Sequence, residues 1–208
     1  DMLELAAHGS RVLMGRSVEF GRRFGIPLHV RSSFHDRPGT WVKETAMEQA
    51  IISGVAHVKD EAKITVTGVP DRPGVAAELF EKLADAEINI DMIVQNVSSD
   101  GRTDISFTAP EDFADLAVKA AKEAAEELGA GDVDVDTSIA KVSLVGAGMK
   151  TEPGVAARLF RCMADADINI GMISTSTSRV SVIVDEAQVE AAVRALAEEF
   201  DLTEEASA

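Results

Sequence analysis

Cysteine and aromatic residues are scarce in this sequence. Cys162 is the single cysteine among 208 residues, and the duplicated copy of its helix has Lys82 at the matching position. We therefore interpret Cys162 as an inert side chain rather than a nucleophile or a metal ligand. Aromatic residues make up 4% of the chain, which opposes an RNA-binding surface built from exposed aromatic rings.

Basic residues are also in short supply. The chain has 20 lysines and arginines against 36 aspartates and glutamates, which gives a net charge of −16. Without a basic field the chain cannot displace counterions from phosphates, so nucleic acid is not a predicted partner. Many acidic residues fall on expected helix surfaces, for example Glu123, Glu126 and Glu127, and we interpret them as a solvated face.

Long apolar runs and catalytic motifs are missing as well. No stretch is apolar enough to span a bilayer and no signal-peptide pattern begins the chain, so a cytoplasmic protein is predicted. Residues 146–150 lack the ending of a phosphate-binding loop. The histidines have no metal-ligand spacing and no plausible serine or cysteine partner, and they are His8, His29, His35 and His57. The sequence thus predicts no catalytic residue and no metal site.

What the chain does contain is an internal duplication. Residues 72–93 and 152–173 are identical at 15 of 22 positions when one copy is displaced by 80 residues. Each copy consists of an alternating strand, a short polar loop, a helix that begins at Pro-Gly, and a second strand that begins at Ile-Asn-Ile. A repeat of this length is too long for a solenoid and suits a pair of small α+β domains.

The first copy contains the six elements of a ferredoxin-like βαββαβ domain. Its expected elements are strand 63–69, helix 73–86, strand 89–98, strand 103–109, helix 111–128 and strand 132–140. The second copy is expected to contain strand 141–147, helix 153–166, strand 169–176, strand 179–184 and helix 185–200. Only a polar tail follows, so its last strand is missing. We predict that a strand at about 51–58, ahead of the first domain, completes the second domain.

The residues before the duplication are too few to form a core of their own. Residues 2–24 predict a helix that breaks near Gly9, residues 26–31 a short strand, and residues 32–39 a turn-rich connection. The apolar pattern begins at Asp1 without a helix cap. We therefore interpret this segment as the end of a larger domain whose body is absent.

The loops that lead into the two repeat helices are the best candidates for a binding site. Pro-Gly begins both helices, so glycine leaves room for a ligand and the first-turn N–H groups can attract a carboxylate. A small amino acid bound at Gly74 could place its ammonium group near Asp91, or near the side-chain carbonyl of Gln95 or Asn96. The alternative is purely structural, because Pro-Gly is favourable at any helix start and Asn89 is then a turn residue.

Three stretches of the first copy, residues 71–76, 88–98 and 103–108, form a pattern that has counterparts in the second copy at residues 141–149 and 172–176. This pattern closely resembles the tandem ACT domains of aspartokinase. Upstream, the sequences at the start of the chain and before the turn-rich connection look like the last helix and strand of the amino-acid-kinase domain of that family. In this family the early strand is contributed to the second ACT domain, in agreement with the strand count.

The resemblance implies the regulatory region of an enzyme that phosphorylates aspartate with ATP, on the route to lysine, threonine and methionine. It is similar to the β subunit of α₂β₂ aspartokinases. ATP and Mg²⁺ are implied for the full-length enzyme, whereas this segment should hold no cofactor and should not be catalytic alone. The implied domains are residues 1–45 as the end of the kinase domain, 46–62 as the contributed strand, 63–140 as the first ACT domain and 141–208 as the second.

The resemblance also implies effector sites. In such relatives threonine or lysine binds at the seams between ACT domains and inhibits the enzyme by feedback. Carried over by position, the expected contacts in the first domain are Asp71, Pro73, Gly74, Val75, Ala76, Asn89, Ile90, Asp91, Gln95, Asn96 and Ser98. In the second domain they are Met149, Thr151, Gly154, Val155, Asn169, Ile170, Ser174 and Thr175. The other expected partners are a second copy of the chain, paired through the ACT domains, and a catalytic kinase chain, but neither nucleic acid nor a membrane.

The second copy departs from the family pattern at two places. The family usually has an acidic residue at the position of Gly171, and Ser-Glu-Ile at the position of Ser176-Thr177-Ser178. Losing two carboxylates beside a seam that binds a cationic amino acid predicts weak sensitivity to lysine. The first copy keeps the pattern and predicts sensitivity to threonine.

Two other classes of function stay open. A non-catalytic amino-acid sensor or dimerisation module would need no kinase tail, and residues 1–44 count against it. A ferredoxin-like RNA or metal binder would need exposed aromatics, basic strands or clusters of cysteine and histidine. The low aromatic share and the net charge of −16 oppose that class.

Overall fold

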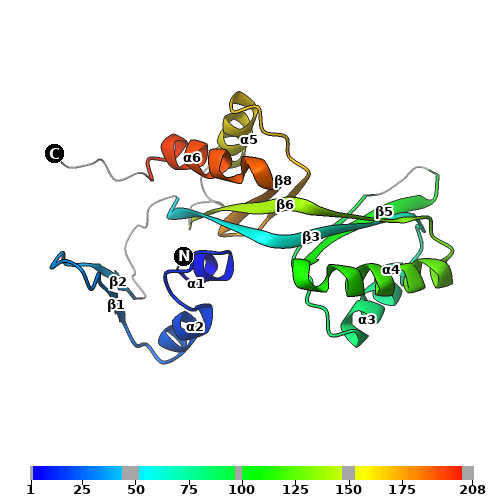
Figure 1. Ribbon diagram of the computed structural model, residues 1–208, viewed down its shortest axis with the longest axis horizontal. Helices are drawn as coiled ribbons and strands as arrows, with labels where there is room; N and C mark the ends of the chain where they lie inside the picture. Colours follow the sequence, from blue (N-terminus) through cyan, green and yellow to red (C-terminus); the bar gives the residue numbers. More distant parts are fainter. Residues whose placement is uncertain (1, 44–51, 97–99, 147–152, 203–208) are drawn as a thin grey trace. The chain divides into compact units, whose positions relative to one another are not determined.

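The computed structural model describes residues 2–43, 52–96, 100–146 and 153–202 (Figure 1). Contacts within the chain divide it into two compact units, which we call unit 1 and unit 2. Unit 1 contains Asp1–Val58, Val142–Val182 and Gln188–Ala208. Unit 2 contains Lys59–Lys141 and Ile183–Ala187. Each repeat therefore lies mainly in one unit, the first in unit 2 and the second in unit 1.

Unit 2 is a sheet with two helices on one face (Figure 1). Its strand order is β4-β5-β3-β6. The strands are β3 (Gly54–Pro70), β4 (Ile93–Gln95), β5 (Arg102–Pro110) and β6 (Val133–Val145). The helices are α3 (Val75–Asp85) and α4 (Ala114–Leu128), the latter preceded by the short 3₁₀ helix η1 (Glu111–Phe113). This βαββαβ order confirms the predicted ferredoxin-like fold.

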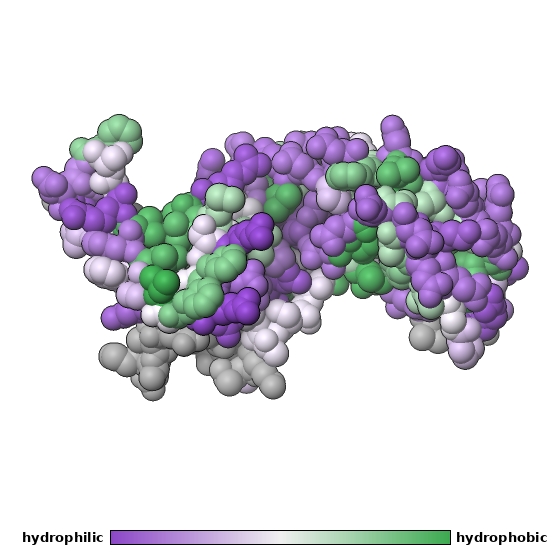
Figure 2. Space-filling view, turned by 90° about the horizontal axis from the view of Figure 1, so that it is seen from below, coloured by the Kyte–Doolittle hydropathy of each residue, from purple (hydrophilic) through white to green (hydrophobic). Residues whose placement is uncertain are grey.

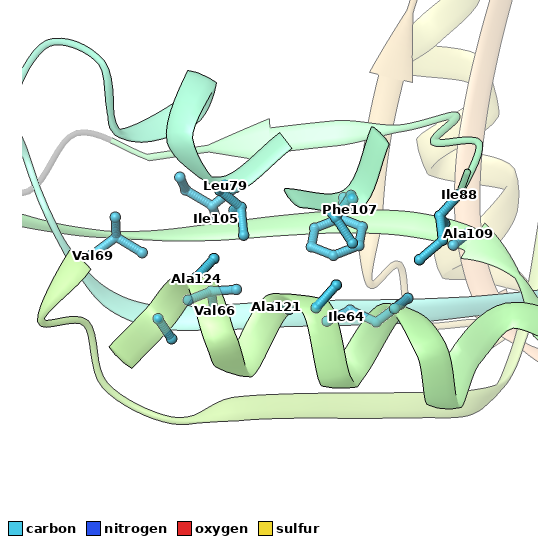
Figure 3. Close-up of a cluster of buried hydrophobic side chains, with 14 of the residues drawn as sticks. Ile64, Val66, Val69, Leu79, Ile88, Ile105, Phe107, Ala109, Ala121 and Ala124 are labelled. Atoms are coloured by element: carbon cyan, nitrogen blue, oxygen red, sulfur yellow. The ribbon is translucent and has the colours of Figure 1, made fainter. Parts of the chain in front are cut away.

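The core of unit 2 follows directly from the alternation of its strands (Figure 3). Alternate residues of β3 and β5 point toward the helices, and a helical stripe from α3 and α4 packs on them. Phe107 is fully buried, and its ring meets that of Phe80 edge to face at a centroid distance of 5.6 Å. The α4 stripe is largely alanine, which lets the helix approach the sheet closely. The residues of this core include Ala62, Ile64, Val66, Leu79, Leu83, Ile105, Phe107, Ala117, Ala121 and Ala124.

Unit 1 repeats the same plan with the strand order β3-β6-β8-β7. The new elements are β7 (Met172–Thr175), β8 (Arg179–Asp185), α5 (Val155–Asp165), α6 (Val189–Glu199) and the short 3₁₀ helix η3 (Glu186–Gln188). The first part of β3, up to Val58, belongs to unit 1 and thus completes the second ferredoxin-like fold from a position ahead of the first, as predicted. The strand begins at Gly54, and Ile51, the predicted first residue, lies outside the described residues.

Two pairs of predicted strands are continuous in the structure. The strands expected at 51–58 and 63–69 form the single strand β3, and those expected at 132–140 and 141–147 form the single strand β6. No glycine or proline separates the members of either pair, so nothing in the backbone ends the first strand. The domain boundaries given above stay a prediction, and the boundary at 45–46 lies outside the described residues.

The edge strands are shorter than predicted. The strand expected at 89–98 is reduced to β4, and the strand expected at 169–176 is reduced to β7. Helix α3 is followed by Glu87 in the left-handed region, with a φ of 58°, and the chain then needs several residues to reach the edge of the sheet. Helix 111–128 begins as predicted but with the 3₁₀ turn η1.

The first 43 residues contain two helices and one hairpin. The predicted helix 2–24 is divided into α1 (Met2–Ala7) and α2 (Gly15–Arg23), with Gly9 between them at a φ of 105°. Strand β1 (Leu28–Val30) pairs antiparallel with β2 (Thr40–Val42), which the sequence analysis missed. The ring of His29 stacks on Trp41 at a centroid distance of 4.0 Å, and this cross-strand pair stabilises the hairpin.

This N-terminal segment exposes many large hydrophobic side chains. Figure 2 shows one face of the molecule, where exposed hydrophobic residues lie among hydrophilic ones. Phe34 is the extreme case, with 95% of its surface exposed. The others in the segment are Val12, Met14, Phe20, Phe24, Ile26 and Trp41. Exposed apolar residues gathered in this way are typical of a surface that packs on more protein.

Candidate functional site

The first candidate site lies at one end of the sheet of unit 2. Strands β3 and β4 both pair antiparallel with β5, so they run parallel to each other and end on the same side. The loop that follows Pro70 is joined to this end, because the backbone N–H of Asp71 donates to the carbonyl of Gly101 at 2.9 Å. The loop before α3 and the residues Gln95 and Asn96 at the end of β4 therefore lie at the same end of the sheet.

The start of α3 has the features expected of a binding loop. Gly74 adopts a φ of 99°, a left-handed conformation that a side chain would strain, and Val75 then begins the helix. Asp71, Pro73 and Gly74 are exposed, Ala76 is half-buried, and Val75 is buried in the core. Free N–H groups of the first helical turn can thus meet a carboxylate at this point.

An ion pair lies beside this helix start. The guanidinium of Arg72 donates two hydrogen bonds to the carboxylate of Glu78, at 2.7 and 3.0 Å. The hydrogen bond with Glu78 raises the pKa of Arg72, and the same bond lowers the pKa of Glu78. Both side chains are exposed to solvent, so we treat the pair as an orienting contact rather than a source of stability.

The end of β4 is held by its neighbours. Gln95 and Asn96 are exposed, and the hydroxyl of Thr103 donates to the main-chain carbonyl of Asn96. Arg102 reaches across the end of the sheet and donates to the carbonyl of Gly68 at 2.6 Å. The side-chain amide of Gln95 can therefore face a ligand from a fixed backbone. Ser98, another predicted contact, lies outside the described residues.

Three other predicted contacts, Asn89, Ile90 and Asp91, lie in the segment that leads into β4, at the opposite end of the sheet from Gln95. The N–H of Asp91 donates to the carbonyl of Thr108, far along β5 from the residues that meet Gln95. Gln95 is four positions after Asp91, which in extended chain places their Cα atoms roughly 13 Å apart. The structure does not bring these three residues together with Gly74.

Asp91 also contacts residues that the sequence analysis did not select. Its carboxylate accepts a hydrogen bond from the ammonium of Lys141, which also donates to Glu61. Lys141 is 3% exposed and Glu61 is 8% exposed, so both charges are buried. Both strands contain other charged residues, so no signal in the sequence singled out this cluster.

The second candidate site is the equivalent end of unit 1. Gly154 has the same φ of 99° before α5, and Val155 is buried behind it. Ser174 and Thr175 end β7, and Asn169 and Ile170 precede that strand as Asn89 and Ile90 precede β4. Met149 and Thr151 lie outside the described residues.

A second buried group that sequence reasoning did not identify contains His8. His8 is 6% exposed, and its ring hydrogen-bonds to the guanidinium of Arg179 within unit 1. Glu4, one turn earlier on α1, lies 3.6 Å from the same ring. Sequence spacing gave no signal for this contact, because Arg179 is 171 positions away.

Neither a metal centre nor a membrane span is found among the described residues. No group of three or more histidine, cysteine, aspartate or glutamate side chains in these residues could hold a metal ion. No helix in the same part of the chain is long and apolar enough to cross a bilayer. A shallow groove on unit 2 lies between α3 and α4, away from the predicted effector residues, and it is lined by Glu78, Glu81, Lys82, Asp85, Ala124, Glu127 and Leu128.

Cys162 is expected to react slowly. Partial burial raises the pKa of its thiol, and the nearby carboxylates of Glu199 and Asp165 raise it further. A raised pKa leaves less thiolate at neutral pH, so we expect alkylation by iodoacetamide at pH 7 to be several-fold slower than for a cysteine in an unfolded peptide. The rate should rise as the pH increases above roughly 8.5, the ordinary thiol pKa. Equal rates at pH 7 would contradict an inert role for Cys162.

The two repeats match a known protein family. A model of the ACT domain matches residues 64–124 and 142–200, the two repeats. An aspartokinase of Mycolicibacterium smegmatis is 49% identical over 208 residues, an alignment that covers 97% of this chain and 49% of that protein. The chain thus spans about half the length of the relatives it matches.

Two solved structures cover the repeat region. A structure of aspartokinase α and β subunits is 45% identical, has a TM-score of 0.68, and is matched over 72% of this chain and 99% of its own. The ligand-free regulatory subunit of aspartate kinase from Thermus thermophilus is 41% identical, has a TM-score of 0.69, and is matched over 72% and 99%. The chain therefore belongs to the ACT-domain family, as a tandem pair of the kind that forms the regulatory part of aspartokinases.

Proposed function

We propose that this chain is the region through which an aspartokinase senses end-product amino acids, with threonine as the principal effector. The observation that carries the proposal is the convergence, at one end of unit 2, of the start of α3 with the exposed side chains of Gln95 and Asn96. An amino acid could place its carboxylate at the first turn of α3 beside Gly74, and its polar groups at Gln95 and Asn96.

The proposed contacts of the first site are fewer than the sequence suggested. We keep the residues at the helix start and at the end of β4, namely Asp71, Pro73, Gly74, Val75, Ala76, Gln95 and Asn96. We also keep Ser98 from its sequence position, outside the described residues. Asn89, Ile90 and Asp91 are too far along the strand path to meet the same small ligand. In the second site we keep Gly154, Val155, Ser174 and Thr175 at the corresponding end, and Met149 and Thr151 from their sequence positions, outside the described residues. Asn169 and Ile170 are the counterparts of Asn89 and Ile90, which we leave out.

We propose a weaker response to lysine. Gly171 is exposed just before β7 and offers no carboxylate, and the hairpin after Ser176 carries only hydroxyl groups. A cationic side chain would find no partner there, so its ammonium would be desolvated without compensation. Binding of lysine to this chain should be weaker than binding of threonine.

We further propose that residues 1–45 are the end of a catalytic domain. Their exposed hydrophobic side chains, and an ACT match that begins only at residue 64, support this division. ATP and Mg²⁺ would then belong to the catalytic half of such an enzyme, in the cytoplasm that the sequence predicts. Effector binding would favour an inhibited arrangement, and a coupling of about 1–3 kcal/mol is sufficient for ordinary feedback.

A homodimer is part of the proposal. The edge of unit 2 is β4, a three-residue strand whose Ile93 is exposed, and such an edge can pair with a second copy of the chain. Pairing at β4 would place two copies of the first site near a shared seam, where each could complete the other.

Calorimetric titration tests the proposed function. The chain should bind threonine, and Gln95→Ala should lower the affinity at least about tenfold, because a hydrogen bond to a charged or polar ligand group is lost. Asn89→Ala is the matched control, since it removes an exposed amide at the other end of the strand path and should leave the affinity unchanged. Lysine should bind more weakly than threonine in the same experiment.

Two outcomes of this titration would overturn the proposal. If neither amino acid bound at millimolar concentration, the chain would be a dimerisation module or a sensor for another ligand. If Asn89→Ala weakened binding and Gln95→Ala did not, the site would lie at the other end of the sheet.

A further inference from the structure

The cluster of Lys141, Glu61 and Asp91 joins three separate parts of unit 2. Glu61 is on β3, Lys141 is on β6, and Asp91 is in the segment that leads into β4. One ammonium contacts both carboxylates, and the second oxygen of Glu61, Oε2, is buried without a hydrogen-bond partner among the described residues. The cluster is therefore built around Lys141, and its most exposed member is Asp91, whose side chain is 34% exposed.

Side chains add to the main-chain hydrogen bonds that hold strand β4. The strand has only three residues paired with β5, and two further main-chain bonds extend this pairing, from the N–H of Asp91 to the carbonyl of Thr108 and from the N–H of Thr108 to the carbonyl of Met92. At its entrance the N–H of Met92 donates to the hydroxyl of Thr108 at 3.2 Å, and Asp91 is held by Lys141. At its exit the hydroxyl of Thr103 donates to Asn96. Both ends of the strand are thus fixed by side chains of its neighbours.

The second repeat lacks the groups at the entrance. Each repeat has one hydrogen bond between two hydroxyls, and these two bonds show which positions correspond. The hydroxyls of Thr65 and Ser106 are 2.9 Å apart in unit 2, and those of Ser143 and Ser181 are 2.8 Å apart in unit 1. Ser106 thus corresponds to Ser181, and Thr108, two residues later, corresponds to Ile183, which has no hydroxyl. The residue equivalent to Asp91 is Gly171, which has no carboxylate.

We infer that Lys141 and Asp91 are positioning residues for the first effector site: they hold the entrance of β4 so that Gln95 and Asn96 are preorganised to bind an amino acid. This inference rests on the proposed function and assigns Asp91 a role without ligand contact. The first repeat is consequently the high-affinity site, and the second, which lacks the hydroxyl of Thr108 and the carboxylate of Asp91, binds more weakly. If a fraction of the molecules loses the correct position of β4, the apparent affinity falls by that fraction.

The experiment distinguishes positioning from direct contact. A double variant, Glu61→Gln with Lys141→Met, removes the ammonium and the buried carboxylate together, so that no charge of the pair is left uncompensated. Asp91 then loses its contact with Lys141. If this contact positions β4, calorimetry should show about tenfold weaker threonine binding, as in Asp91→Asn. If Asp91 instead contacts the ammonium group of the ligand, removing Lys141 should leave the affinity unchanged or increase it.

Three controls make the result specific. Lys141→Arg keeps the cation and should retain binding to within about twofold of the wild type. Lys122→Met, an exposed lysine on α4, makes the same chemical change and should have no effect. Asp91→Asn combined with the double variant should be no worse than either alone, because all three act through one contact.

Amide hydrogen exchange supplies a readout that does not depend on the ligand. The amide of Val94, which lies opposite Ser106 in the strand register, should exchange faster in the double variant, while those of β3 stay protected. Unchanged threonine affinity in both Asp91→Asn and the double variant, with a wild type that binds, would overturn the inference. A wild type that does not bind at all would instead overturn the proposed function.

Discussion

Replacing Lys141 with methionine should lower the free energy of unfolding of the chain by about 3–5 kcal/mol. The ammonium of Lys141 is 3% exposed and contacts the carboxylates of Glu61 and Asp91. Methionine fills a similar volume but leaves Glu61 as a buried charge with no partner. The cost arises from that uncompensated charge rather than from the loss of an attraction. Urea denaturation followed by circular dichroism would measure it.

A matched variant separates the cost of an uncompensated buried charge from the loss of an attraction. The variant that combines Glu61→Leu with Lys141→Met removes both buried charges and should recover most of the lost stability, because apolar residues of similar volume often replace a buried ion pair without loss. Lys122→Met, on the surface of α4, should change the unfolding free energy by less than about 0.5 kcal/mol. A single variant as stable as the wild type would show that Lys141 is not buried with its partners.

Replacing Phe107 with alanine should destabilise the chain by about 3–5 kcal/mol, since a large buried ring is removed and the cavity cannot fully collapse. Phe107 is fully buried on β5 between Ile64 of β3 and Ile93 of β4 in the strand register, and its ring meets Phe80. The edge-to-face contact with Phe80 would be lost along with the buried area. The same denaturation experiment measures the change.

Phe107→Leu is the control for this effect. Leucine keeps much of the apolar volume, so its cost should be clearly smaller than that of alanine. Phe113→Ala, at an exposed phenylalanine of the 3₁₀ helix η1, should have a much smaller effect. Similar losses at Phe107 and Phe113 would contradict the assignment of the core.

Alternation and turn chemistry were enough to predict the fold. The ferredoxin-like order followed from the helical stripes, the Pro-Gly starts and the count of strands, which also located the strand contributed to the second domain. This reasoning did not predict that two pairs of strands are each one continuous strand, and it missed a short strand. The junctions near Glu61 and Lys141 contain no breaker, and only pairing in space shows that each joins two strands into one. Strand β2 has three residues, too few to produce a periodic signal.

The candidate site was predictable only in part. Local chemistry identified Gly74 and Gly154, whose positive φ angles are a backbone requirement that a single residue reveals. The partner of Asp91 was not predictable, because Lys141 lies 50 positions away and the contact depends on the packing of strands. The sequence predicts Asp91 as a ligand contact, and the structure shows in addition that its carboxylate accepts a hydrogen bond from the buried Lys141.

Amide-resolved NMR titration of this chain with threonine tests the central claim most directly. The proposed function predicts saturable shifts at Asp71, Gly74, Gln95 and Asn96, with smaller shifts at the end of β7. The amides of Asn89 and Ile90 should shift least among the residues of the first repeat that the sequence analysis selected. Shifts confined to Asn89 and Ile90, or none at millimolar threonine, would contradict the claim that the first repeat binds an amino acid at the start of α3.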